Sequence, residues 1–236
     1  SAALFIGIYL IRIQFLNLDF FDEKLDSEKP SGLNIAKDFK SIITERKFLI
    51  LMPSTMIVGL IITGMVLYQY VFVEDKGWSP ELYAAFFTGY AVTHLVFSVF
   101  GGVWVDRFTA KKMFRFYLIP LVFGLLSFGF IDSILGGALF LFTAGVTMGT
   151  SGTIKTALLA EVYGINKLGR IRSLFTMFMV LSTALGPLVV GWMIDMNWSI
   201  QNIMLTLCGA LLLCILNSQR IVYVKSVEEK EAVTNS

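Results

Sequence analysis

Two ionisable side chains interrupt long apolar stretches of the sequence and are the first candidates for chemistry. Lys155 continues a helical face of small residues at Gly145 and Ser151. A lysine inside an apolar helix costs roughly 2.5 to 3.5 kcal/mol unless it is hydrated or paired. One interpretation is that Lys155 attracts an anionic substrate or takes part in coupling. The alternative is that its long side chain extends to the inner membrane surface, about two helical turns away. His94, the only histidine, either exchanges a proton near physiological pH or is neutral and hydrogen-bonded to a neighbouring helix.

The remaining polar residues do not form a catalytic constellation. No acidic residue lies deep in the apolar stretches, and no histidine, cysteine, aspartate or glutamate grouping has metal-ligand spacing. Cys208 and Cys214, six residues apart in one apolar run, fit neither a helical disulfide nor a zinc site. The sequence therefore predicts no catalytic residue, no metal and no cofactor, and it argues against an enzyme. Proton coupling would use Glu161 or a carboxylate elsewhere in the protein.

Long apolar runs must position these side chains. With 56% hydrophobic and 15% charged residues, the chain is too apolar for a soluble domain. We expect an all-α, polytopic membrane bundle over residues 47–218. Its six runs approach or exceed the length of a transmembrane helix: 48–73, 82–105, 113–131, 134–160, 173–194 and 199–217.

The flanking segments differ in character from the six runs. Residues 1–13 are apolar but short, which indicates the end of a truncated transmembrane helix. Residues 14–46 are polar and predict a cytoplasmic linker. Apolar residues at helical spacing within 35–43 indicate either an amphipathic helix on the membrane surface or a disordered linker with a chance pattern. The polar residues 219–236 predict a tail.

The charges of the short connections orient the bundle. Two connections, between the second and third runs and between the fourth and fifth, are rich in Lys and Arg. The other three connections between runs hold several acidic residues and only Lys76 as a cation. Because basic connections stay in the cytoplasm, this asymmetry places the linker and the C-terminus there, most simply in a bacterial inner membrane. The basic residues follow the membrane face and give no support to a nucleic-acid partner. The cations of the two basic connections are Arg107, Lys111, Lys112 and Arg115, then Lys167, Arg170 and Arg172.

The first basic connection also carries a motif. Gly102, Asp106, Arg107 and Lys111 follow the spacing G-x-x-x-D-R-x-x-x-K. This resembles the cytoplasmic hairpin signature of the major facilitator superfamily of secondary transporters, usually written G-x-x-x-D-R-x-G-R-[RK]. Thr109 replaces the usual glycine and Ala110 the usual arginine. The resemblance implies two three-helix repeats that form the C-terminal half of such a transporter, with the N-terminal half of the same protein as partner.

The resemblance also implies a substrate path. In this family the first helix of each repeat lines the path, which makes Thr63, Tyr68 and Gln69 candidates. Ser151 and Lys155 are candidates because they share the small-residue face of the fourth run. Packing against neighbouring helices is the alternative for the first three. Gly186-Pro187 resembles the G-P-x-x-G element of helices that rock during transport, and a proline there frees backbone groups and bends the helix.

An inner gate is expected around the same motif. Glu161, Arg170 and Arg172 fall in the second basic connection, and Glu161 can pair with Arg107, Arg170 or Arg172. Asp106 is expected near the start of the fifth run, where a helix N-terminus favours an anion. Gly102, Lys111 and Lys112 complete the set. The alternative is a static, solvated ion cluster.

The sequence thus predicts a secondary active transporter that moves a small solute by alternating access, with proton coupling open. Lys155 favours an organic anion such as a monocarboxylate. The segment YQYVFVEDKGWSPE is similar to the Q…KGWS segment of many bacterial facilitators, some grouped with monocarboxylate carriers. The alternatives are a neutral or amphiphilic solute exported from the cell, and a non-transporting receptor or enzyme.

Overall fold

The computed structural model describes residues 41–223. The expected helix end at 1–13, the linker up to residue 40 with most of its amphipathic pattern, and the tail from 224 onward lie outside the described residues. Within 41–223 the chain forms helices and short connections, and no strand occurs in this part. Six of the helical stretches are long and apolar enough to cross a membrane, as the apolar runs predict.

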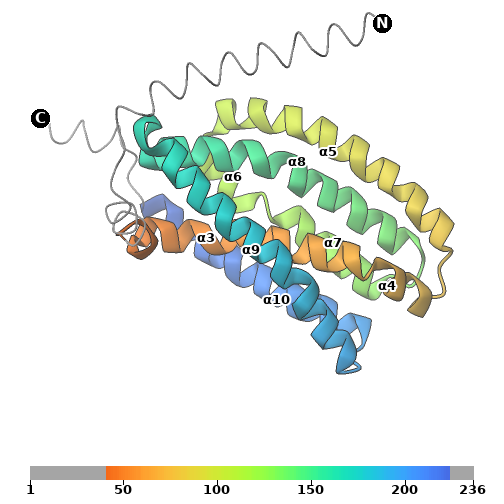
Figure 1. The fold of residues 1–236 in the computed structure, drawn as a ribbon. Coiled ribbons are helices and arrows are strands. Elements are labelled where there is room, and N and C mark those ends of the chain that lie inside the picture. Colours follow the sequence, from red (N-terminus) through yellow and green to blue (C-terminus); the bar gives the residue numbers. More distant parts are fainter. Residues whose placement is uncertain (1–40, 224–236) are drawn as a thin grey trace, which may run out of the picture. The chain divides into compact units, whose positions relative to one another are not determined.

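The helices follow one another with short turns (Figure 1). The first long stretch is α3 followed by α4, and the third is α6 followed by α7; the other four are single helices. Their bounds are α3 Arg46–Leu67, α4 Gln69–Asp75, α5 Pro80–Phe108, α6 Ala110–Phe116, α7 Ile119–Phe130, α8 Leu135–Tyr163, α9 Leu168–Asp195 and α10 Ile200–Ser218, with the 3₁₀ turns η2 Ile165–Lys167 and η3 Gln219–Tyr223.

Two of the expected continuous runs are interrupted. At Tyr68 the backbone leaves the α-helical region, with φ −97° and ψ 11°, and the Tyr68 ring lies against Gly191 of α9. The third run pauses between α6 and α7, where Pro120 has no N–H to continue the helical ladder and starts the next helix instead. Both interruptions leave the number of crossings unchanged.

The second basic connection is shorter than expected. The prediction placed residues 161–172 in a loop, but α8 continues to Tyr163 and α9 begins at Leu168. Gly164 makes the turn with φ +79°, a conformation that glycine adopts without a steric penalty. Glu161 is therefore a residue of α8, and Arg170 and Arg172 belong to the first turns of α9.

Because successive helices are antiparallel, the connections lie at two ends of the bundle. We call these the Lys111 end, with the α5–α6 and α8–α9 turns, and the Trp78 end, with the α4–α5, α7–α8 and α9–α10 turns. Contacts between sequence-distant residues support both ends: Lys111 meets Glu161 at the first, and Trp78 meets Asp132 at the second. The basic connections thus share one end, as the charge pattern requires.

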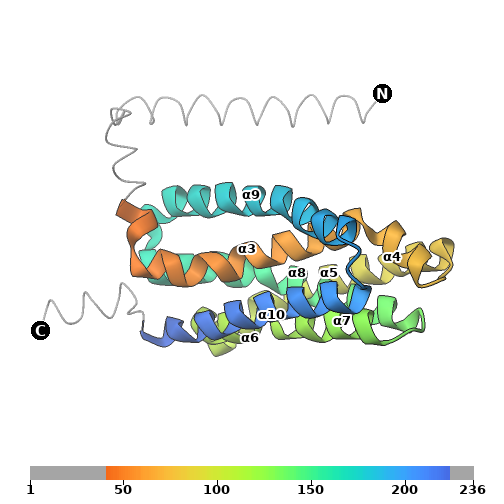
Figure 2. The same cartoon turned by 90° about the horizontal axis from the view of Figure 1, so that it is seen from below.

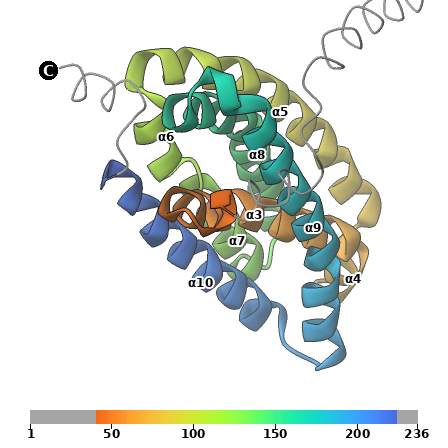
Figure 3. The ribbon, with the colours of Figure 1, turned by 60° about the vertical axis from the view of Figure 1, so that its left-hand side comes forward.

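The packing pairs helices from the two three-helix repeats. α5 packs along α8, and α9 packs against α3 (Figure 1). α3 lies between α9 and α10 in the view from below (Figure 2). The third view shows α3 enclosed by its neighbours (Figure 3), and more than half of its apolar window is buried. In α5 only 11% of the corresponding window is buried, so most of its apolar side chains are free to face lipid or another helical unit.

Candidate functional site

A cavity of about 850 Å³ opens between α3, α5, α8 and α9. It brings together four of the predicted substrate-binding residues: Thr63 of α3, His94 of α5, and Ser151 and Lys155 of α8. Arg172, predicted as a gate residue, contributes to the same lining from α9. Four helices that are distant in sequence therefore position one site.

Lys155 is the half-buried cation of this cavity. Its Nζ donates to the backbone carbonyl of Thr55 on α3, with Nζ and O 3.4 Å apart. A lysine ammonium has three donors, so this contact leaves two for other partners. The lining of this cavity contains Lys155, Arg172 and His94 but no Asp or Glu. Such a site favours the negative group of a ligand.

Hydroxyl groups supply most of the other polar atoms of the lining. Each of them donates to a backbone carbonyl, in most cases one turn earlier in its own helix. Thr153 is the exception, because it reaches across to the Ser98 carbonyl at 3.5 Å. The eight hydroxyl residues are Thr55, Thr63, Ser98, Ser151, Thr153, Thr156, Thr176 and Thr183.

Thr63 also connects α3 to α9 at the point where Pro187 disturbs the helical ladder. Pro187 has no N–H, so the carbonyl of Thr183, four residues earlier, lacks its helical donor. The Thr63 hydroxyl lies 3.0 Å from that carbonyl. At Gly186, an added Cβ would collide with the Leu60 carbonyl of α3, so glycine is needed for this close approach. α9 continues through Gly186-Pro187 as one helix, and the expected role of this pair in bending stays a prediction.

Two predicted substrate residues lie away from the cavity. Gln69 lines a second pocket of about 470 Å³ between α4 and α5, together with Tyr70, Tyr83 and Phe87. The Oε1 atom of Gln69 is buried and has no hydrogen-bond donor among the described residues. Tyr68 lies in the lining of neither pocket, and its ring packs on Gly191.

At the Lys111 end, the ion pair differs from the expected ones. Glu161 of α8 pairs with Lys111 of α6, with Nζ and Oε1 3.7 Å apart. The sequence could not choose among the cations of this end, and Lys111 is the one that α6 places beside α8. Arg172 lies instead in the cavity lining, and Arg170 is an exposed residue of α9.

The motif residues themselves are at the exposed end of α5. Asp106 and Arg107 are exposed, and Arg107 lies over the Phe108 ring. In the described part of the chain, no hydrogen bond or ion pair joins Asp106 to the start of α9, and its expected position near that helix stays a prediction. Gly102 faces Thr153 of α8, and Lys112 is exposed.

The turn after this motif has an unusual backbone. Thr109 has φ +71° and ψ 145°, a region that is almost restricted to glycine. The conformation ends α5 and starts α6 with a single residue between them.

Comparison with known proteins assigns the family. A model of the Major Facilitator Superfamily matches residues 5–235. The chain belongs to this superfamily. A search among curated proteins found no match. The superfamily consists of membrane transporters. This facilitator chain is therefore a multi-pass integral membrane protein that functions in transmembrane transport.

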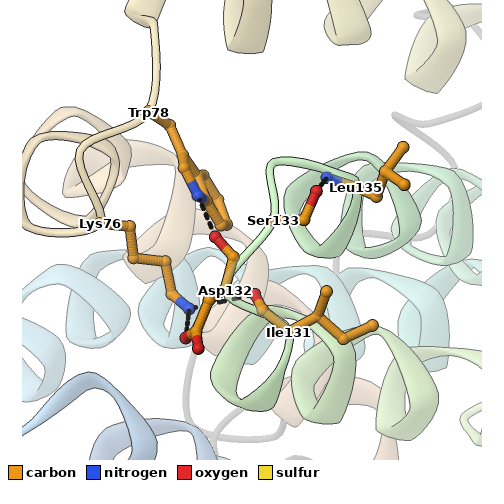
Figure 4. A network of polar contacts seen from close by, with 6 residues as sticks. All are labelled: Lys76, Trp78, Ile131, Asp132, Ser133 and Leu135. Atoms are coloured by element: carbon orange, nitrogen blue, oxygen red, sulfur yellow. Dashed lines mark hydrogen bonds and ion pairs between the residues drawn. The ribbon is translucent and has the colours of Figure 1, made fainter.

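The Trp78 end of this facilitator holds a polar network that the sequence did not predict (Figure 4). Trp78 Nε1 donates to the Asp132 carbonyl at 2.6 Å, and Lys76 Nζ lies 3.9 Å from Asp132 Oδ1 and 3.3 Å from the Ile131 carbonyl. The Lys76 side chain is only 7% exposed. Burial lowers the pKa of Lys76, and the nearby carboxylates of Asp132 and Asp75 oppose that shift.

Trp78 itself, in the α4–α5 turn, is buried and packs against Tyr83 and Phe128. From the sequence, Lys76 was recognised only as the single cation of the connections at this end of the bundle. No sequence signal joins Lys76 to Asp132, because the two residues lie in different turns, and 55 residues separate Lys76 from the Ile131 carbonyl that it also contacts.

Sequence reasoning also missed Gly149, a close contact between α8 and α5. An added Cβ at Gly149 would lie 2.6 Å from the His94 carbonyl. Gly145, four residues earlier, makes a similar approach to the Tyr90 carbonyl. The spacing G-x-x-x-G was the signal that could have identified the pair.

Proposed function

We propose that the protein is a secondary transporter of small organic anions and that the cavity between α3, α5, α8 and α9 is its half of the substrate path. The observation that carries the proposal is Lys155, which projects from α8 into a lining without carboxylates. Within residues 41–223 its only hydrogen bond is to the Thr55 carbonyl. An ammonium in that position attracts a carboxylate and repels a cation. Arg172 adds a second positive charge toward the Lys111 end.

In this proposal, residues 47–218 form the C-terminal six-helix half of a transporter that works by alternating access. Transporters with repeated helical units bind substrate near the midplane, where the units meet. The charge asymmetry between the two ends supports a cytoplasmic Lys111 end and C-terminus, in a bacterial inner membrane.

The proposal gives the Lys111 end the role of inner gate. The Lys111–Glu161 pair joins α6 to α8, and Asp106 and Arg107 are exposed and available to a second helical unit. Lys112, Arg170 and Gly102 belong to the same region. Gly186-Pro187 supplies the bend of α9 during the transition. Coupling to protons would use His94 in the cavity or Glu161 at the gate.

The decisive experiment measures uptake into proteoliposomes that contain the full-length protein. Lys155→Gln should reduce uptake of small carboxylates at least tenfold, while Lys155→Arg should retain more of it because the charge remains. Lys167→Gln removes an exposed cation of η2 outside the cavity and should leave uptake unchanged. Retained carboxylate uptake in Lys155→Gln would overturn the anion assignment.

A neutral or amphiphilic solute is the second candidate, supported by the pocket between α4 and α5. Its lining is mainly aromatic and apolar, with Tyr70, Val73, Tyr83 and Phe87, and it includes Gln69, whose buried carbonyl oxygen has no hydrogen-bond partner among the described residues. Such a pocket suits an amphiphile with one hydrogen-bond donor. Uptake or export of a neutral amphiphile that Gln69→Leu abolishes and Lys155→Gln leaves intact would favour this candidate.

A further inference from the structure

The hydroxyl groups of the main cavity share one hydrogen-bonding state. A serine or threonine hydroxyl has one proton and two acceptor lone pairs. In this cavity the proton is used by a backbone carbonyl: Ser151 donates to the Met148 carbonyl at 3.0 Å, and Thr176 to the Arg172 carbonyl at 2.9 Å. Each of these hydroxyl oxygens therefore keeps lone pairs with which it can accept a hydrogen bond from a ligand.

The donors of the cavity are of a different kind from these acceptors. Among side chains of the lining, N–H donors belong to Lys155, Arg172 and His94, and the lining contains no Asp, Glu, Asn or Gln. The site thus offers the positive charges of Lys155 and Arg172 for an anion, and neutral oxygen acceptors for the rest of the ligand. A ligand that satisfies both needs a negative group and at least one O–H donor.

We infer that the substrate is a hydroxylated carboxylate, either a short 2-hydroxy acid or a longer sugar acid, rather than an alkyl carboxylate. This inference rests on the proposed anion transport. The carboxylate binds the ammonium of Lys155, and the substrate hydroxyls donate to threonine and serine oxygens. Ser151 lies one helical turn before Lys155 on α8, about 6 Å along the axis, within reach of a hydroxyl next to the carboxylate.

The opposite wall gives the same preference to longer acids. Thr176 and Thr183 lie seven residues apart on one face of α9, and both line the cavity. The Thr183 hydroxyl donates to the Val180 carbonyl at 2.7 Å, so it too presents an acceptor. A longer acid with several hydroxyl groups therefore has further acceptors on α9. An alkyl chain would cover them without a hydrogen bond, which is unfavourable for desolvated polar groups.

The test compares matched pairs of solutes in proteoliposomes with the full-length protein. Lactate is paired with propionate and gluconate with hexanoate, and the neutral polyols propane-1,2-diol and sorbitol serve as uncharged partners. We expect each hydroxy acid to be taken up at least tenfold faster than its hydroxyl-free partner, because a site that accepts substrate hydroxyls discriminates against analogues without them. Both neutral polyols should be poor substrates.

Variants of the cavity wall connect this preference to the hydroxyl oxygens. Thr176→Val and Thr183→Val keep the side-chain shape and remove an acceptor, and at least one of them should reduce the hydroxy-acid preference threefold or more. Thr206→Val is the matched control, since Thr206 of α10 is exposed and makes the same bond to its own helix, with Oγ1 2.8 Å from the Asn202 carbonyl. It should leave the preference unchanged.

The outcomes separate the inference from the proposed function. Equal uptake of hydroxylated and plain carboxylates, still dependent on Lys155, would overturn the hydroxyl inference and leave anion transport in place. A preference that survives both valine variants would also overturn it, because the acceptors would not be its cause. Uptake of polyols without either class of acid would overturn both.

Discussion

The two main helix contacts of the bundle, α5 with α8 and α3 with α9, are built differently. α5 and α8 approach through glycines: added Cβ atoms at Gly149 and Gly145 would lie 2.6 Å and 2.9 Å from backbone carbonyls of α5. α3 and α9 also approach at glycines, but here two shorter hydroxyl hydrogen bonds join the helices, whereas the Thr153 hydroxyl of α8 lies 3.5 Å from the Ser98 carbonyl of α5. Ser182 donates to the Met56 carbonyl at 2.8 Å, and Thr63 lies 3.0 Å from the Thr183 carbonyl.

This difference separates a contact fixed by shape from one that can exchange partners. Close glycine packing tolerates almost no added volume, since backbone atoms cannot move aside as a flexible side chain does. A hydroxyl, in contrast, can rotate: Thr63 has acceptors in its own helix, at the Gly59 carbonyl, and in α9, at the Thr183 carbonyl. The Thr63 hydroxyl has one proton for these two carbonyls. It can therefore form the hydrogen bond to α9 or give it up for the one within α3. We therefore expect α5 and α8 to move together, and α3 and α9 to change their contact.

The largest expected effect comes from breaking the glycine contact. Gly149→Val would place a branched side chain against the His94 carbonyl and should lower the free energy of unfolding by about 3 kcal/mol, at the upper end of overpacking effects. Gly152→Val is the control on the same helix, because an added Cβ there meets nothing within 4 Å. Thermal unfolding in detergent measures both. Similar melting temperatures for the two variants would contradict the shape-fixed contact.

A smaller effect is expected at the exchangeable contact, and it should depend on Pro187. Thr63→Val removes the donor to the Thr183 carbonyl and should cost about 1 kcal/mol, within the range of hydrogen bonds between membrane helices. In Pro187→Ala, the new N–H can serve the same carbonyl within α9, so Thr63→Val should then cost less.

The double-mutant cycle measures this dependence directly. Thr63→Ser retains a hydroxyl and should behave as the wild type in both backgrounds. If Thr63→Val costs the same with and without Pro187, the freed carbonyl is not what Thr63 serves. The coupling would then have to be sought in the glycine contacts of α3 with α9.

The sequence revealed the helices better than their partners. Uncharged runs gave six crossings, and cation positions put the two basic connections at one end, because length and charge alone determine those features. Which helix lies beside which depends on shape, so the Gly149 contact and the choice of Lys111 for Glu161 were not found. For the cavity, polarity within an apolar helix identified Lys155 and His94, but Gln69 proved to belong to another pocket.

The smallest expected effect concerns the end of α5, where sequence and backbone disagree. Thr109 stands where the facilitator signature has glycine, yet its φ of +71° is the conformation that glycine would adopt. A β-branched residue is strained there, so Thr109→Gly should raise the free energy of unfolding. We expect a net gain of about 1 kcal/mol after the larger conformational entropy that glycine loses on folding is subtracted.

The control is Thr206→Gly, at an exposed position in the middle of α10, where the change in stability should have the opposite sign. There glycine should destabilise the protein by roughly 0.5 to 1 kcal/mol, because it replaces a residue with ordinary helical dihedrals. Opposite shifts of melting temperature in the two variants are expected. Loss of stability in both would mean that Thr109 is not strained and that the α5–α6 turn tolerates threonine as well as glycine.

Since that turn sets Lys111 beside Glu161, a stabilised Thr109→Gly protein should also hold the α6–α8 ion pair more firmly, and Glu161→Gln should cost more stability in it than in the wild type.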